Sequence, residues 1–268
     1  MKPSPRPPGH HQRKEAQRAM SHEQSDLRYP PLPAPYDGAL RAAVAAIMAA
    51  YTPFGIIAAG SVLRGQGGPS SDIDLYVLHA APFRQRLQRR YGGVPFEIFI
   101  NTPQQVRRYF EEEHAAARPI TAHILTSGFV MLDLDPAVQA LRAEAAQWLA
   151  KAPAPSADAL LWRRYAIADE LDNAGDVLAV DPACASLILH AAVNKLVEYA
   201  FVSRNRNLPR QKELLAALDT LDAEAGARAR AFYAAADAPA QLIAATALAA
   251  HLTGATTFFE WDSARQPV

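Results

Sequence analysis

Cysteine is almost absent from the 268-residue sequence, which has one, Cys184, and this excludes an internal disulfide. Cys184 lies in an apolar helical stretch with no metal-ligand pattern nearby, so we expect it to be buried and inert. The sequence also lacks any apolar run near the roughly 18 residues that span a membrane, and its N-terminus lacks the apolar core of a signal peptide. We therefore expect a cytosolic, cytoplasmic protein with no membrane partner.

An excess of charge of either sign is also absent. The 27 Lys and Arg residues equal the 27 Asp and Glu residues, so no global field attracts the chain to nucleic acid or to an anionic membrane. Any polyanion site must be local, and a nucleic-acid partner is not expected. Hydrophobic residues make up 50% of the chain, which is enough to form the core of one large or two small globular domains.

Apolar periodicity is missing from residues 1–34, which are rich in Pro, His, Arg and Gln. Such a segment cannot bury enough surface to offset the entropy lost on ordering, so we predict a disordered tail. The stretch before Met20 has the most irregular composition, which leaves Met20 as an alternative start of translation.

Helix and strand signals alternate over the next hundred residues. This alternation predicts an α/β (α+β) domain over residues 35–150, with a small mixed sheet flanked by helices. The basic run 82–90 is predicted to be a short helix, and its arginines, Arg84, Arg86, Arg89 and Arg90, resemble a phosphate patch, although such a run is usually a solvated face. The predicted strands are 54–60, 72–79, 95–100 and 129–133, and the other predicted helices are 36–52, 103–113 and 119–127.

Strand signals disappear beyond Pro136, where Ala, Leu, Arg and Glu dominate. The Pro-containing stretch 152–156 is a plausible linker. Residues 157–262 are then expected to form an α-helical domain, whose contact with the first domain would form a cleft. The predicted helices lie near 157–177, 183–203, 210–220, 223–236 and 239–256.

The most informative segment is Asp72-Ile73-Asp74-Leu75. Residues two apart in a strand project from one face, so Asp72 and Asp74 point together while Ile73 and Leu75 point to the core. Two adjacent carboxylates repel unless a cation lies between them, and Mg²⁺ suits an all-oxygen site. Glu97, a charge amid apolar residues on the next predicted strand, would complete a cluster of three carboxylates.

Gly60 and Ser61 precede this strand across a link rich in helix and strand breakers. Gly60 lets the backbone turn sharply and lets amides approach a polyphosphate, while the Ser61 hydroxyl can donate to phosphate oxygens. Arg64 lies just beyond and suits a phosphate. The three residues are therefore candidates to bind a polyphosphate.

This joint pattern of apolar strand, Gly60-Ser61, Asp72-Ile73-Asp74 and a later acidic strand residue resembles the nucleotidyltransferase superfamily typified by DNA polymerase β. The order of the domains looks like that of the aminoglycoside and lincosamide adenylyltransferases. The segment 70–75, Ser-Ser-Asp-Ile-Asp-Leu, is especially similar to the streptomycin and spectinomycin adenylyltransferases. The resemblance covers residues 36–133 by motif, and only by helical character thereafter.

The resemblance implies a nucleotidyltransferase fold and an enzyme that moves a nucleoside monophosphate to an acceptor hydroxyl. The donor would be a Mg²⁺-bound nucleoside triphosphate, with ATP and transfer of AMP expected. Gly60 and Ser61 would hold the triphosphate, and Asp72 and Asp74 would bind the metal. Glu97 would either complete the metal cluster or deprotonate the acceptor hydroxyl.

Two groups in the helical half bear on substrates. By the same resemblance Lys212, at the start of a predicted helix, would reach the triphosphate, and helix N-termini favour phosphate. The predicted helix 157–177 carries acidic residues at helical spacing, including Asp169 and Asp172. This stripe is either a solvated face or a site for a small, cationic polyol such as an aminoglycoside, docked between the domains.

Two alternatives to a small-molecule enzyme stay open. One is nucleotidylation of a protein or an RNA, as in toxin–antitoxin systems, and the other is a non-catalytic nucleotide-binding module on the same fold. A polar row on the predicted helix 183–203 also has two interpretations, the wall of a cleft or a polar seam between helices. The row consists of His190, Asn194, Lys195 and Glu198.

Overall fold

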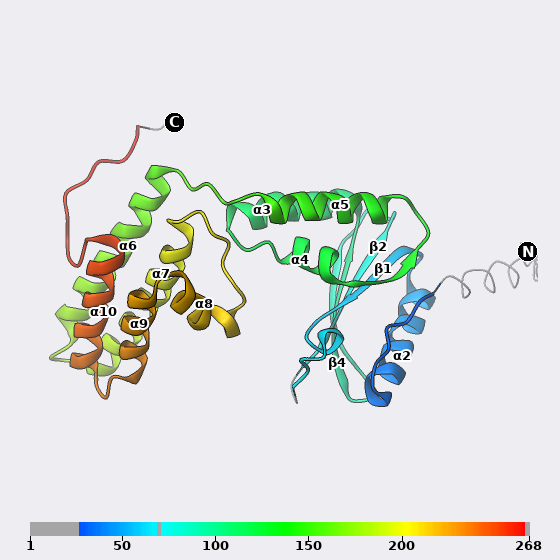
Figure 1. Cartoon of the computed structure of the whole chain (residues 1–268), viewed down its shortest axis with the longest axis horizontal. Helices are drawn as coiled ribbons and strands as arrows, with labels where there is room; N and C mark the ends of the chain where they lie inside the picture. The colour runs from blue at the N-terminus through cyan, green and yellow to red at the C-terminus, as the bar shows by residue number, and fades with distance from the viewer. Residues whose placement is uncertain (1–26, 69–70, 266–268) are drawn as a thin grey trace, which may run out of the picture. The chain divides into compact units, whose positions relative to one another are not determined.

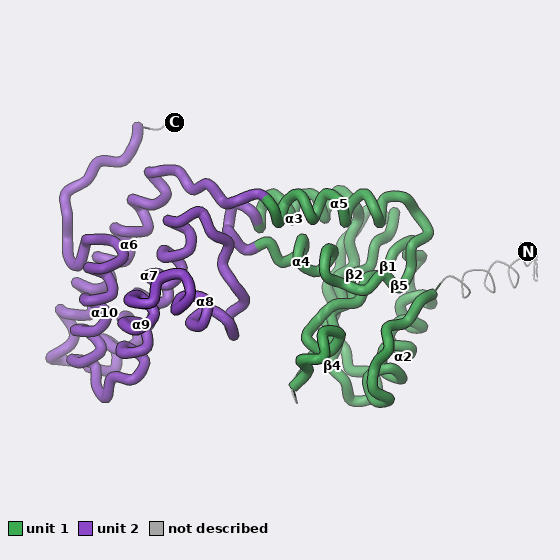
Figure 2. The backbone as a smooth tube through the Cα atoms, in the orientation of Figure 1, with its two compact units in different colours: residues 1–113, 119–150 green, residues 114–118, 151–268 purple. Residues whose placement is uncertain are grey.

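The computed structural model describes residues 27–68 and 71–265, which divide into two compact units (Figures 1 and 2). Unit 1 contains Pro119–Ala150 and the described residues up to Glu113. Unit 2 contains His114–Arg118 and the described residues from Lys151 onward.

Unit 1 is built on a five-stranded mixed sheet with the strand order β3-β4-β2-β1-β5. Strands β2 and β4 are parallel, and the other neighbouring pairs are antiparallel. The predicted small mixed sheet of an α/β domain is therefore confirmed. The strands are β1 (Pro53–Ala59), β2 (Ile73–His79), β3 (Gln85–Tyr91), β4 (Val94–Asn101) and β5 (Phe129–Asp133).

Helices of unit 1 pack on both faces of this sheet. Helix α2 (Ala34–Ala50) shares a core with Ile73 and Leu75 of β2. On the opposite face, Tyr76 and Leu78 share a core with α3 (Pro103–Ala115), α4 (Ile120–Ser127) and α5 (Ala137–Ala150). Because side chains alternate along a strand, Asp72 and Asp74 lie on the same face as Tyr76. We call this the site face.

The predicted disordered tail, 1–34, extends too far. The backbone N–H of Arg28 donates to the carbonyl of Met131 in β5 at 2.8 Å, and Leu27, Tyr29 and Leu32 pack against the core that α2 covers. Three apolar side chains in seven residues bury enough surface to hold this segment on the sheet. Residues 1–26, and with them the alternative start at Met20, lie outside the described residues.

The predicted helix over 82–90 is wrong, because residues 85–90 belong to the edge strand β3. Gly92 and Gly93, with φ angles of 55° and 84°, make the two-residue turn that leads back into β4. Positive φ at both turn positions suits the twist of a hairpin and strongly favours glycine. The basic side chains are tolerated on this strand because most of them face solvent at the edge of the sheet.

Unit 2 is entirely helical apart from its connections, within the described residues. Aspartate or serine caps start four of its helices: Ser156, Asp181, Asp222 and Asp237 each accept a hydrogen bond from the backbone N–H three residues later. The helical region predicted after the sheet is confirmed. Its helices are α6 (Ala157–Val177), α7 (Pro182–Val202), α8 (Leu214–Leu221), α9 (Ala223–Ala234) and α10 (Ala238–Thr253).

Helix α7 is the most apolar long helix among the described residues. By length and composition alone it could cross a membrane, with a mean hydropathy of 1.2. In the structure Leu189, Val193 and Leu196 are fully buried in the core of unit 2, which contains residues of α6 and α10 as well. Cys184, in the first turn of α7, is half-buried, so the expectation of a buried thiol is wrong.

Candidate active site

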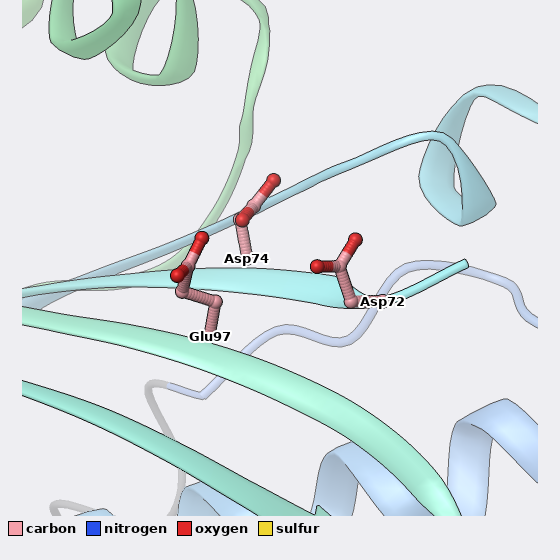
Figure 3. A group of neighbouring side chains, drawn as sticks. All are labelled: Asp72, Asp74 and Glu97. Carbon is pink, nitrogen blue, oxygen red and sulfur yellow. The ribbon is translucent and has the colours of Figure 1, made fainter. Parts of the chain in front are cut away.

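Three carboxylates converge on the site face of unit 1. Asp74 of β2 and Glu97 of β4 lie directly opposite each other in the parallel register, and Asp72 precedes Asp74 by two residues. One carboxylate oxygen from each residue lies within 4.8 Å of the others. Figure 3 shows the three side chains on the same side of their strands. The structure thus brings together the three residues that the sequence predicted as neighbours.

The alternation of burial along the two strands explains this convergence. Ile73 and Leu75 are fully buried toward α2, as are Phe96 and Ile98. The residues between them must then point to the other face, where Asp74 and Glu97 are half-buried and Asp72 is exposed. Burial of the apolar neighbours on one side therefore fixes the carboxylates on the other.

Gly60, directly after β1, allows the chain to pass close to the two aspartates. Its φ of 112° is a conformation that other residues rarely adopt. A Cβ atom at this position would lie 3.0 Å from the backbone oxygen of Asp72 and 3.5 Å from Oδ2 of Asp74. Glycine is thus required both by the backbone angle and by the close approach to the carboxylates.

Asp74 is the most electrostatically perturbed member of the cluster. Its pKa is raised from 3.8 to about 6, first by burial and then by the neighbouring charges of Asp72 and Glu97, while Arg64 and Arg86 oppose the shift. The folded protein therefore holds a carboxylate that is costly to ionise without a cation. A donor set of oxygen atoms only, under mutual repulsion, fits a hard divalent cation such as Mg²⁺.

Glu97 is held by side chains of the edge strand. Arg86 donates to Oε1 of Glu97 through both Nε, at 3.0 Å, and Nη2, and Gln88 donates to the same oxygen through Nε2 at 3.3 Å. Oε2 is the oxygen that these donors do not use. The sequence analysis missed Arg86 and Gln88 because it assigned residues 82–90 to a helix, and the Gly92-Gly93 turn is the signal that identifies the strand.

The loop after Gly60 closes on itself through serine hydroxyls. The Oγ of Ser61 donates to the Oγ of Ser71 at 2.9 Å, and the backbone N–H of Gly68 donates to the same oxygen at 2.8 Å. Arg64 ends the short 3₁₀ turn η1 (Val62–Arg64) and is exposed. Its charge lowers the pKa of Asp74, and its proposed role in binding phosphate stays a prediction.

Two hollows flank this arrangement, each of about 330 Å³. The first opens beside Gly60 and Arg64 and is lined also by Pro30, Pro31, Ala59, Leu63, Ser127, Gly128 and Phe129. The second lies between the carboxylates and the edge strand and is lined by Asp72, Gln88, Arg89, Arg90, Pro95, Phe96 and Glu97. The first hollow is lined by apolar side chains together with a serine and an arginine, whereas charged residues of both signs line the second.

Lys212 belongs to unit 2 rather than to the unit that holds the carboxylates. It lies in the 3₁₀ turn η2 (Gln211–Glu213), immediately before α8. Its position directly before a helix agrees with the expected local structure, while its assignment to a triphosphate stays a prediction.

The polar row on α7 has partners inside unit 2. Asn194 accepts a hydrogen bond from the hydroxyl of Tyr233 at 3.1 Å, Lys195 pairs with Glu170 of α6, and Glu198 pairs with Arg118 at 2.6 Å. His190 contacts the carbonyl of Ser186 and the ring of Phe232. Of the two interpretations left open by the sequence, these contacts favour a polar seam between helices.

Two residues of the acidic stripe on α6 also have partners in unit 2. Asp172 accepts a hydrogen bond from the backbone N–H of Phe258 at 2.7 Å, and Asp169 accepts one from Asn173 at 3.2 Å. Two of the aspartates that were candidates to bind a cationic acceptor therefore already accept hydrogen bonds within unit 2.

No family model matches the sequence, and no curated protein matches it either. Among solved structures, the chain is similar to a nucleotidyltransferase-like protein from Exiguobacterium sibiricum, with 12% sequence identity and a TM-score of 0.49. The match covers 81% of this chain and 76% of that protein. At this level of similarity no activity is transferred from that protein, and the function is argued from the geometry of the site.

Proposed function

We propose that this chain is a metal-dependent nucleotidyltransferase that moves a nucleoside monophosphate from a nucleoside triphosphate to an acceptor hydroxyl. One observation carries the proposal: Asp72, Asp74 and Glu97 bring carboxylate oxygens within 4.8 Å of one another, beside a glycine at which a Cβ atom would lie only 3.0 Å from the backbone of Asp72. A cluster of like charges is costly, and a bound cation would offset that cost.

The residues present fit a magnesium site. Asp72, Asp74 and Glu97 would hold the ion, which would neutralise charge on the phosphates during transfer. Glu97 fits the role of a ligand better than that of a general base, because Arg86 and Gln88 already occupy one of its two oxygens. The remaining oxygen, Oε2, is then the one available to the cluster.

The nucleotide would lie on the side of the cluster where Gly60 and Arg64 are found. Gly60 leaves the backbone accessible to phosphate oxygens, and the Ser61 hydroxyl, now bonded to Ser71, would turn to donate to them. Arg64 would bind the phosphates as a cation. The hollow of about 330 Å³ beside these residues would receive the nucleoside, with ATP as the proposed donor.

The acceptor hydroxyl is the least constrained part of the proposal. A small cationic acceptor, such as an aminoglycoside, depends on the acidic stripe of α6, where Asp172 and Asp169 already accept hydrogen bonds within unit 2. That acceptor therefore stays a prediction without support from a specific contact.

The proposed activity is tested by incubating the full chain with Mg²⁺ and nucleoside triphosphates labelled at the α-phosphate, in the presence of aminoglycoside, nucleotide and RNA acceptors. Label should move to an acceptor as pyrophosphate is released. Asp72→Asn and Asp74→Asn should abolish transfer, while Asp135→Asn, an exposed aspartate outside the cluster, should retain it. Transfer at the wild-type rate by both cluster variants would overturn the proposal.

A further inference from the structure

The edge strand β3 concentrates positive charge beside the carboxylates on a chain that is neutral overall. Residues 84–93 include Arg84, Arg86, Arg89 and Arg90 and no acidic residue. An attraction for polyanions, which the net charge excludes for the whole molecule, is therefore possible at this place. We call these four arginines the basic edge.

The register of β3 places Arg86 and Arg90 on the site face. Gln88 is paired with Glu97, Arg86 with Phe99 and Arg90 with Pro95. Because side chains alternate, Arg86, Gln88 and Arg90 project from the same face as the carboxylates. Arg84, just before the strand, is in phase with them and contacts Tyr109 of α3. Three arginines therefore run in one row beside the cluster.

Most of this charge is unpaired. Arg86 is bound to Glu97, but within the described residues Arg84, Arg89 and Arg90 form no ion pair. Arg89 and Arg90 donate only to the backbone carbonyls of Gln88 and Gly93. All four are exposed to solvent. Their charge is thus available to a ligand.

The length of the row selects the kind of ligand. Arg84 and Arg90 are six residues apart, which is about 20 Å along an extended strand. One phosphate group cannot contact both ends of such a row, whereas the repeated phosphates of a nucleic-acid strand can. The hollow of about 330 Å³ lined by Gln88, Arg90, Asp72 and Glu97 connects the row to the carboxylates.

We propose that the basic edge is a docking surface for single-stranded nucleic acid, whose sugar–phosphate backbone follows β3 and presents a ribose hydroxyl to the carboxylate cluster. The identification of this nucleic acid as the acceptor rests on the proposed function. The proposal that it docks on the basic edge does not. Arginines on an edge strand also protect it from pairing with other strands, and that role alone predicts no affinity for nucleic acid.

Docking is measured by fluorescence anisotropy with a short, labelled, single-stranded oligoribonucleotide, at low salt, with EDTA and without a triphosphate. The test variant is Arg84→Gln with Arg90→Gln, which leaves Arg86 and its contact with Glu97 intact. The matched control, Arg41→Gln with Arg108→Gln, removes the same charge from α2 and α3 of unit 1. Circular dichroism establishes that each variant is folded.

We expect the test variant to weaken binding about tenfold and to reduce the slope of log K against log salt by about 1.4, or about 0.7 for each lost phosphate contact on a single strand. The control should bind like the wild type. Three results would overturn the proposal: no binding by the wild type, equal losses in both variants, or competition by a nucleoside monophosphate as strong as by the oligonucleotide. Because metal and triphosphate are absent, a failure of nucleotidyl transfer leaves this test unaffected.

Discussion

Replacement of Asp74 by asparagine should stabilise the protein in the absence of metal, and the gain should depend on pH. Burial and two neighbouring carboxylates raise the pKa of Asp74 from 3.8 to about 6. The folded state therefore binds this proton more tightly than the unfolded state does. At about pH 3 and below both states are protonated and there is no penalty. The penalty grows as the pH rises from 3.8 and is complete above about 6.

The size of the effect follows from the shift in pKa. A difference in pKa of about two units, at about 1.4 kcal/mol each, gives an upper limit of about 3 kcal/mol for the increase in the free energy of unfolding on substitution. Asp74 is only half-buried and asparagine must still be hydrated, so we expect a gain of about 1–2 kcal/mol near pH 8. Near pH 3 the gain should disappear, because asparagine resembles the protonated acid.

The assay must report on unit 1 alone. Trp148 lies in α5 of unit 1, whereas Trp162 and Trp261 belong to unit 2. Urea unfolding in EDTA is therefore followed by tryptophan fluorescence in a background where Trp162 and Trp261 are phenylalanine. Asp135→Asn, at an exposed position outside the cluster, serves as the control and should show no pH-dependent gain. Equal stability of Asp74→Asn and the parent protein at both pH values would refute the reasoning.

Three further predictions concern the surroundings of the cluster. Arg86→Gln should weaken Mg²⁺ binding about threefold to tenfold, because Glu97 loses its main hydrogen-bond donor, and Arg86→Lys should bind Mg²⁺ with intermediate affinity. Calorimetry measures the affinity of both variants, with Arg108→Gln as the control. Gly60→Ala should destabilise unit 1 by about 1–2 kcal/mol in the urea assay, since its Cβ would lie 3.0 Å from the Asp72 carbonyl at a positive φ; unchanged stability would contradict the assigned backbone. Gly93→Ala, at a φ of 84° in the hairpin turn, should increase hydrogen exchange in peptides from β3. The control is Gly38→Ala, on helix α2, where an added Cβ would meet open space.

The carboxylate cluster was predictable because it depends on local rules. Asp72 and Asp74 share a face by the period of a strand, and buried neighbours on both strands require the charges to point away from α2. Glu97 could be placed on a strand from its apolar flanks. Its direct pairing with Asp74, however, results from the parallel contact of β2 and β4, which the sequence does not encode locally.

The strand conformation of the basic edge and the ordering of the N-terminal segment were not predicted, for different reasons. A strand at an exposed edge buries little, so β3 has no apolar alternation to distinguish it from a solvated helix, and only the Gly92-Gly93 turn identifies it. Residues 27–33 are ordered by contacts with β5 and the core, which are tertiary and leave no period in the sequence. Misassigning β3 concealed both the support of Glu97 and the row of arginines.

The central claim, that the three carboxylates form a metal-dependent nucleotide site, is tested most directly by calorimetric titration with a non-hydrolysable Mg²⁺–nucleoside triphosphate analogue. The wild type and Asp135→Asn should bind with the same affinity. Asp72→Asn, Asp74→Asn and Glu97→Gln should each bind at least about tenfold more weakly, a loss of about 1.4 kcal/mol or more. Equal affinity in the wild type and all three cluster variants, with the fold intact, would contradict the claim.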